Sequence, residues 1–130
     1  MTEVFALGIL SGLLGMASKA DLEKVEAELE RILASDERVE KAYQHIRDYF
    51  VFTNKRLILV DKQGVTGKKV EYHSIPYRSI EHFSVETAGR FDLDAELKIW
   101  VRGMAAPIQK EFRKDAHIYE VQKALAEYAL

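Results

Sequence analysis

The chain contains no cysteine and no excess of basic residues. The absence of cysteine excludes disulfide bonds, thiolate catalysis, and zinc or iron–sulfur sites with cysteine ligands. The 19 basic and 21 acidic residues give a net charge of −2, which argues against general electrostatic attraction to nucleic acid or to an anionic membrane. We therefore expect no nucleic-acid partner, and the lack of cysteine fits a cytoplasmic location.

A long apolar run is also missing. The uncharged stretch of residues 4–17 is shorter than the roughly 20 residues that span a bilayer. No basic residue precedes it, unlike in a secretory signal, although Ala17–Ser18 resembles a cleavage site and leaves a signal peptide open. We favour a short helix that is apolar on nearly all sides. One small domain cannot cover such a helix alone, so it indicates self-association.

What remains is the composition of one globular domain. The chain has 130 residues, of which 48% are hydrophobic, and this length typically forms a single core. We expect residues 1–34 to form an N-terminal helical segment and residues 35–130 to form the domain proper.

Two amphipathic helices are predicted. Apolar residues recur at helical spacing in the first, which ends at Ser35–Glu37, and in the second, which Asp115 can cap. Their apolar stripes are Leu22, Val25, Leu29 and Ile32 in the first helix, and Ile118, Val121, Leu125 and Tyr128 in the second.

Between the helices the pattern is that of short strands separated by turns. Residues 56–61 are apolar enough to be buried on both faces, and residues 91–102 alternate strictly between apolar and polar. Closely spaced strands without intervening helices predict an antiparallel α+β fold, mainly β, of about seven strands. It would curl into a barrel or sandwich that the C-terminal helix closes. The expected strands are 42–46, 49–52, 56–61, 69–75, 80–87, 91–102 and 107–112.

Motifs for catalysis or metal binding fail when tested. The stretch Gly64–Lys69 lacks the first glycine and the final Ser or Thr of a phosphate loop. Asp92, Asp94 and Glu96 lack the glycine and glutamate of a calcium loop, so a charged ladder with Lys98 is favoured over a weak metal site. The histidines are scattered and no nucleophile motif accompanies them. We assign no catalytic residue, metal or cofactor, and expect a protein that is not an enzyme; a hydrolase would require a pocket of converging titratable groups.

Two surface features leave alternatives open. Trp100 shares the polar side of its strand with Arg102, which is typical of an interface anchor, unless the N-terminal helices cover it. Several basic residues near the glycine-containing loop offer a membrane alternative, in which the apolar N-terminus inserts and cations meet lipid phosphates. The candidates to converge for this role are Lys55, Arg56, Lys62, Lys68 and Lys69, with Lys62, Lys68 and Lys69 as the headgroup-binding set.

Several segments, taken in order, resemble the bacterial pleckstrin-homology (PH) domain family. They are RDYFVFTNKRLILVDKQGVTGKKVEYHSIPYRSI (47–80), HFSVETAGRFDLDAELKIW (82–100) and IYEVQKALAEYAL (118–130), with GLLGMAS (12–18) near the start. The resemblance covers essentially the whole chain. It implies a bent, seven-stranded antiparallel barrel closed by the C-terminal helix, and it carries over no catalytic residue.

The resemblance also implies assembly. Members of this family form cyclic homo-oligomers, with five-fold rings among the single-domain members, and adjacent subunits are thought to build a polar surface suited to binding other proteins. We therefore expect a ring that presents polar strand residues to an unidentified protein partner. The candidate residues for this surface are Arg47, Asp48, Asn54, Lys55, Arg56, Glu86, Asp92, Asp94, Glu96 and Lys98.

Overall fold

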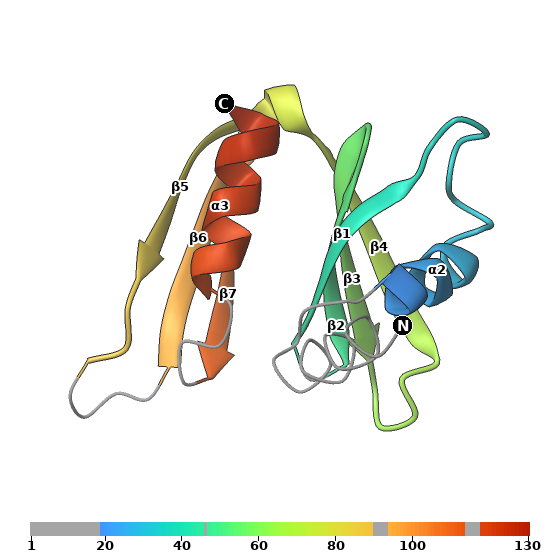
Figure 1. The fold of residues 1–130 in the computed structure, drawn as a ribbon. Helices are drawn as coiled ribbons and strands as arrows, with labels where there is room; N and C mark the ends of the chain where they lie inside the picture. Colours follow the sequence, from blue (N-terminus) through green and yellow to red (C-terminus); the bar gives the residue numbers. More distant parts are fainter. Residues whose placement is uncertain (1–18, 46, 90–93, 114–117) are drawn as a thin grey trace, which may run out of the picture. The chain divides into compact units, whose positions relative to one another are not determined.

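The computed structural model describes residues 19–45, 47–89, 94–113 and 118–130 (Figure 1). These residues form seven strands and two α-helices, and the chain divides into two compact units, Met1–Ser74 and Ile75–Leu130. The apolar stretch 4–17, the candidate residue Asp92 and the expected helix cap Asp115 lie outside the described residues.

The first unit is a four-stranded sheet with strands in the order β1-β2-β3-β4, of which the β1–β2 and β2–β3 pairs are antiparallel. The predicted turn Asn54–Lys55 joins β2 to β3. Gly64 and Gly67 adopt φ angles of 76° and 67° in the loop before β4, a conformation that side chains disfavour. The elements of this unit are α2 (Lys19–Glu28), β1 (Val39–His45), β2 (Asp48–Thr53), β3 (Arg56–Gln63) and β4 (Lys69–Pro76).

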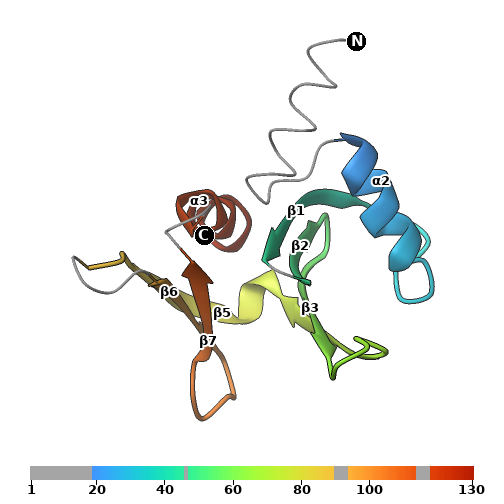
Figure 2. The ribbon, with the colours of Figure 1, turned by 90° about the horizontal axis from the view of Figure 1, so that it is seen from below.

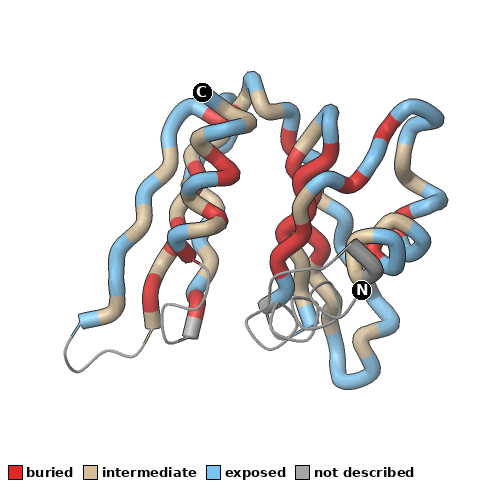
Figure 3. The backbone as a smooth tube through the Cα atoms, viewed as in Figure 1, coloured by how far each residue is buried: buried red, intermediate tan, exposed pale blue. Residues whose placement is uncertain are grey.

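The two central strands of this sheet are the most deeply buried (Figure 3). Residues 50–53 of β2 and 57–60 of β3 are all buried. Because successive side chains in a strand point to opposite faces, both faces of these strands are covered, as predicted for 56–61. On one face, Val25 of α2 and Leu29, which follows the helix, join a core with Val51 and Ile58. α2 lies beside β1 (Figure 2).

The first helix is shorter than the sequence predicts. We expected it to continue to about Ala34, but α2 ends at Glu28 and turns follow. The apolar residues Leu29, Ile32 and Leu33 still pack against the sheet, so the stripe is real although the helix stops. Beyond Glu28 the backbone tightens into turns, in which the N–H of Glu30 donates to the carbonyl of Ala27 and that of Ile32 to the carbonyl of Leu29. The Arg56 Nη2 atom donates a 2.6 Å hydrogen bond to the carbonyl of Ile32 in this segment.

The second unit is a three-stranded antiparallel sheet in the order β5-β6-β7, with a C-terminal helix packed against β5 and β6. Gly103, with a φ of 86°, lies in the connection between β6 and β7. The elements of this unit are η1 (Tyr77–Ser79), β5 (Ile80–Glu86), β6 (Asp94–Val101), β7 (Ile108–Arg113) and α3 (Ile118–Ala129).

The alternation predicted for residues 91–102 is confirmed where the structure describes it. On β6, Ala95, Leu97 and Ile99 are fully buried, while the residues between them remain partly exposed. The stripe of the C-terminal helix is also confirmed: its residues Ile118, Val121 and Leu125 are buried, and Tyr128 stacks on Tyr77 with ring centroids 5.1 Å apart.

The predicted mainly β fold with a C-terminal helix is therefore confirmed. In the described part of the chain, the seven strands form two sheets of four and three strands, and no pairing joins them into one closed barrel. Within the same residues, no helix combines the length and apolar character needed to cross a membrane.

Candidate functional site

One side of the second sheet carries polar residues from all three strands, and we call it the polar face. The register aligns Glu86 of β5 with Glu96 of β6. Paired residues in a sheet point to the same side, so side chains two residues apart along each strand share this face. Most are exposed, and those on β6 are partly so. The polar face comprises His82, Ser84, Glu86, Asp94, Glu96, Lys98, Trp100, Gln109 and Glu111.

Three contacts fix side chains on this face. Glu96 accepts a 2.6 Å hydrogen bond from the Nε2 atom of Gln109 and lies 3.4 Å from the Nζ atom of Lys98. His82 stacks on Trp100 with ring centroids 4.3 Å apart and an interplanar angle of 24°. The face therefore combines a partly exposed indole with fixed charges, as interface anchors commonly do.

The candidate residues from the second unit lie together. Glu86, Asp94, Glu96 and Lys98 all belong to the polar face, as the alternation of the strand predicts. The predicted ladder, in which a lysine offsets the acidic residues, is present between Glu96 and Lys98.

The remaining candidates occupy two opposite ends of the first sheet. Arg47 and Asp48 lie where β2 begins, and the Oδ1 atom of Asp48 accepts a 2.9 Å hydrogen bond from the backbone N–H of Lys62. Asn54, Lys55 and Arg56 lie at the other end of β2, where the chain turns into β3. Within the first unit, these five residues therefore form two groups and not one continuous patch.

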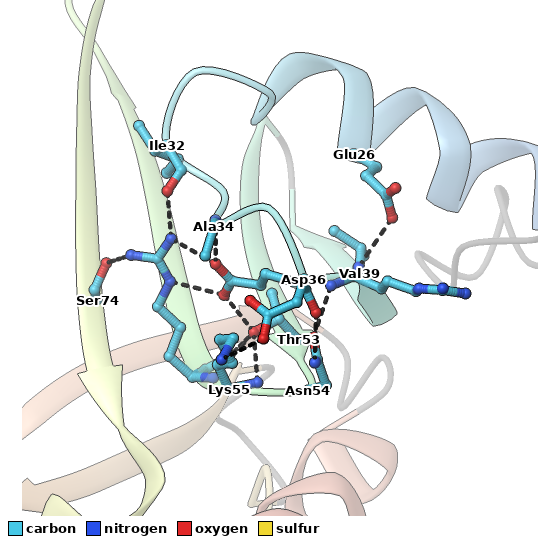
Figure 4. A network of polar contacts seen from close by, with 12 residues as sticks. Glu26, Ile32, Ala34, Asp36, Val39, Thr53, Asn54, Lys55 and Ser74 are labelled. Carbon is cyan, nitrogen blue, oxygen red and sulfur yellow. Dashed lines mark hydrogen bonds and ion pairs between the residues drawn. The ribbon is translucent and has the colours of Figure 1, made fainter.

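Asn54 and Lys55 hold the chain segment that precedes β1 (Figure 4). The side chain of Asn54 accepts a 2.7 Å hydrogen bond from the N–H of Arg38 and donates one to the carbonyl of Asp36. Lys55 forms an exposed ion pair with Asp36 at 3.1 Å. From the helix side, Glu26 accepts a hydrogen bond from the N–H of Val39. These contacts fasten residues 36–39 to the sheet.

Arg56 makes a bidentate ion pair with Glu37. Its Nε and Nη2 atoms donate to the two carboxylate oxygens of Glu37 at 2.8 and 2.9 Å. The Thr53 hydroxyl and the Ala34 N–H also donate to that carboxylate, at 2.6 and 3.0 Å. The remaining guanidinium nitrogen, Nη1, donates to the Ser74 hydroxyl at 2.8 Å. We call Glu37, Thr53 and Arg56 the buried network, since only 1% of the Glu37 side chain is exposed.

These hydrogen bonds determine the charge of Glu37. Burial by itself raises the pKa of the carboxyl group, but the hydrogen bonds from Arg56, Thr53 and Ala34 outweigh it and lower the pKa from 4.5 to about 2. Glu37 is therefore ionised at neutral pH. A buried carboxylate that already accepts four hydrogen bonds has a structural role and is not placed to exchange protons with a substrate.

Sequence reasoning missed Glu37. Ser35–Glu37 has the composition of a solvated helix terminator, and nothing in the local pattern distinguishes Glu37 from its exposed neighbour Asp36. The available signal was indirect: Arg56 begins a strand whose next four residues are fully apolar, so its guanidinium needs a nearby counter-ion.

The proposed convergence of basic residues at the glycine-containing loop is wrong for Lys55 and Arg56. They lie at the start of β3, about 20 Å along the strand from Lys62. Lys62 is itself engaged, with its Nζ atom 3.8 Å from Glu28 and 5.0 Å from the centre of the Tyr49 ring. Lys68 and Lys69 remain exposed beside Val65, which is fully exposed at the loop.

The described residues contain no group of three His, Asp or Glu side chains placed to hold a metal ion. Of the four histidines, His82 belongs to the polar face and His73 is partly buried on β4, while His117 lies outside the described residues. The face that the structure offers is suited to binding by contact and charge.

The chain matches known proteins over almost its whole length. The family described as bacterial PH domain matches residues 8–129. Over 121 residues the chain is 59% identical to the uncharacterized protein YjqA of Bacillus subtilis (strain 168), covering 92% of this chain and 97% of YjqA.

Two solved structures are similar in both sequence and fold. One is a pleckstrin homology domain from Shewanella amazonensis SB2B, with a TM-score of 0.82 and 57% identity, covering 95% of this chain and 99% of that one. The other is a DUF1696 family protein with a pleckstrin-homology domain from Shewanella loihica PV-4, with a TM-score of 0.73 and 55% identity. The match covers 84% of this chain and 93% of that one.

Proposed function

We propose that this chain, which belongs to the bacterial PH domain family, is a non-catalytic cytoplasmic module that assembles with copies of itself into a ring and presents a polar strand surface to a partner protein. The observation that carries this proposal is the polar face, on which Trp100, His82 and fixed charges lie together at the surface. A surface that combines a partly exposed aromatic ring with fixed charges suits recognition of another protein.

Two features support self-association. The stretch 4–17 contains no charged residue, and neighbouring copies would cover the apolar helix that its sequence predicts. In the described part of the chain, each sheet also ends in edge strands. β4 is one of them and is largely exposed, and 42% of the surface of its residue Tyr72 is accessible to solvent. Exposed edges favour packing against another subunit. A ring requires two different patches to meet, because a patch that pairs with itself stops at a dimer.

Deleting residues 1–17 is expected to leave a folded domain and to reduce the assembly. Full-length protein should have a mass several times its 14.9 kDa monomer by light scattering, and the shortened protein a lower mass at the same concentration. Circular dichroism of both proteins controls for folding. A monomeric full-length protein would overturn the proposed assembly, and an unchanged mass after deletion would overturn the role given to the apolar stretch.

A second candidate function, membrane attachment, is favoured by one observation. Val65 is fully exposed between Lys62 and the exposed pair Lys68 and Lys69, so this loop offers an apolar tip with cations beside it. The net charge of −2 and the pairing of Lys62 with Glu28 weigh against it.

Sedimentation with anionic liposomes separates the two functions. We expect the protein to stay in the supernatant, because two exposed lysines supply only about 2 kcal/mol of attraction to an anionic surface. Sedimentation with the liposomes that weakens as salt increases would instead indicate membrane binding. Membrane binding is established if Lys68→Glu and Lys69→Glu together abolish this sedimentation and the matched surface change Lys123→Glu does not affect it.

A further inference from the structure

The polar face has two chemically different ends. At one end the register places Glu86, Glu96 and Glu111 in a single row across the three strands. At the other end Trp100 stacks on His82. Glu96 and Trp100 lie four residues apart on β6, a separation of about 13 Å in a strand. A ligand that uses both ends must therefore place two different groups about 13 Å apart.

The glutamate row does not stabilise the sheet. Like charges directly opposite one another in neighbouring strands are unfavourable. Glu96 has Lys98 and Gln109 as partners, but the described residues provide no ion pair for Glu86 or Glu111, and both are exposed. Among the described residues, Asp94 is the one other acidic residue on the face, and it pairs with Arg113 in the strand register. The row is thus an excess of negative charge at the surface, available to a cation.

The sign of this charge selects the partner. Phosphate-rich partners, both nucleic acid and anionic lipid, would be repelled by the glutamate row. A second copy that used the same face would place glutamates against glutamates, which disfavours a symmetric pairing of two polar faces. A segment with lysine or arginine side chains complements the row, and an apolar side chain on the same segment complements the indole of Trp100.

We propose that the polar face binds a positively charged segment of another protein, with Lys or Arg side chains over the row of Glu86, Glu96 and Glu111 and an aromatic or aliphatic side chain against Trp100. This proposal rests on the proposed function in that it names the class of partner that the scaffold holds. It makes Glu86 and Glu111 the residues that determine specificity and Trp100 the apolar anchor.

Three synthetic peptides test this with the full-length protein. The first carries two lysines with a phenylalanine four positions away, the second has glutamates in place of the lysines, and the third has serine in place of the phenylalanine. Trp100 is the only tryptophan, so its fluorescence reports occupancy of this face. We expect the first peptide to bind, more weakly as salt increases, the third to bind about tenfold more weakly, and the second not to bind.

Charge reversal tests the residues. The double change Glu86→Lys and Glu111→Lys should weaken binding of the first peptide by about tenfold or more. The matched control Glu71→Lys changes an exposed glutamate on β4 of the other sheet and should bind as the wild type does. Equal affinity for the lysine and glutamate peptides, unaltered affinity in the double variant, or no binding at millimolar peptide would overturn the proposal.

Mass measurements on the same samples keep the two proposals apart. A monomeric protein that binds the lysine peptide would overturn the ring but leave the polar face as proposed. An assembled protein that binds no peptide would do the reverse. If the double variant loses mass and its affinity for the peptide is unaltered, the face is a contact between copies and the proposed partner is wrong.

Discussion

Replacing Glu37 by Gln is expected to lower the free energy of unfolding by about 3 kcal/mol at neutral pH. The change keeps the shape of the side chain but removes the charge that Arg56 contacts through two nitrogens, and it turns one acceptor into a donor. The guanidinium of Arg56 is then left largely buried without its counter-ion, with 23% of its side chain exposed. Urea unfolding followed by circular dichroism measures the difference.

The same substitution should flatten the response to acid. Because folding lowers the pKa of Glu37 from 4.5 to about 2, its contribution is complete above about pH 4.5 and is lost as the pH falls toward 2. A shift of this size corresponds to about 3 kcal/mol, so the wild type should lose that much more stability over this interval than Glu37→Gln does.

Asp36→Asn is the matched control for the Glu37 substitution. It makes the same chemical change at the adjacent residue, but the ion pair that it breaks, with Lys55, is exposed to solvent. Such pairs contribute less than about 1 kcal/mol. If Asp36→Asn and Glu37→Gln destabilise the protein equally, the buried network does not have the role we assign to it.

The second large effect is expected at Leu97, in the middle of β6. Replacing Leu97 by Asp should prevent the second unit from folding, since the side chain is fully buried and a carboxylate at this position would lose its hydration. By the register, Leu97 lies between Val85 and Lys110. Far-ultraviolet circular dichroism and amide NMR spectra should show the loss of this sheet.

Two further variants keep this second prediction testable if Leu97→Asp yields no protein. Leu97→Ala removes the same contacts without a charge and should cost about 2–5 kcal/mol. Ser84→Asp introduces the same carboxylate on the exposed polar face, opposite Lys98, and should cost less than about 1 kcal/mol. A stable, fully folded Leu97→Asp protein would show that the buried side of β6 is not a core.

The alternation of β6 was predictable because each residue interacts mainly with one side of its own sheet. Ala95, Leu97 and Ile99 face inward for the same reason that Glu96 and Lys98 do not, and a period of two expresses this directly. The buried side of α3 was equally predictable, because its apolar residues recur at the spacing of a helical turn. Burial of a whole face therefore leaves a signature in the order of the residues.

The burial of Glu37 and the position of the segment after α2 left no such signature. Both involve contacts with Arg56, which is 19 positions from Glu37 and 24 from Ile32 in the sequence. Contacts between residues far apart in the sequence also explain which candidate surface residues were predictable. Glu86 and Lys98 could be assigned to one face because their strands alternate. Asn54 and Arg56 are just as polar, but their side chains bind other parts of the same chain. Local patterns determine which side a residue faces and not which groups it meets there.

The way α2 is attached has a consequence for local opening of the native state. Its apolar residues lie on one side of the first sheet, and the segment after it is held to that sheet by Glu37 and Asn54 (Figure 4). The backbone ladders between β1, β2 and β3 include none of residues 19–37, and the first backbone bond beside them runs from the N–H of Asn54 to the carbonyl of Arg38. The stretch from Lys19 to Glu37 can therefore detach as one cooperative unit while the strands remain paired, and its amides should exchange with solvent together and sooner than those of β2 and β3.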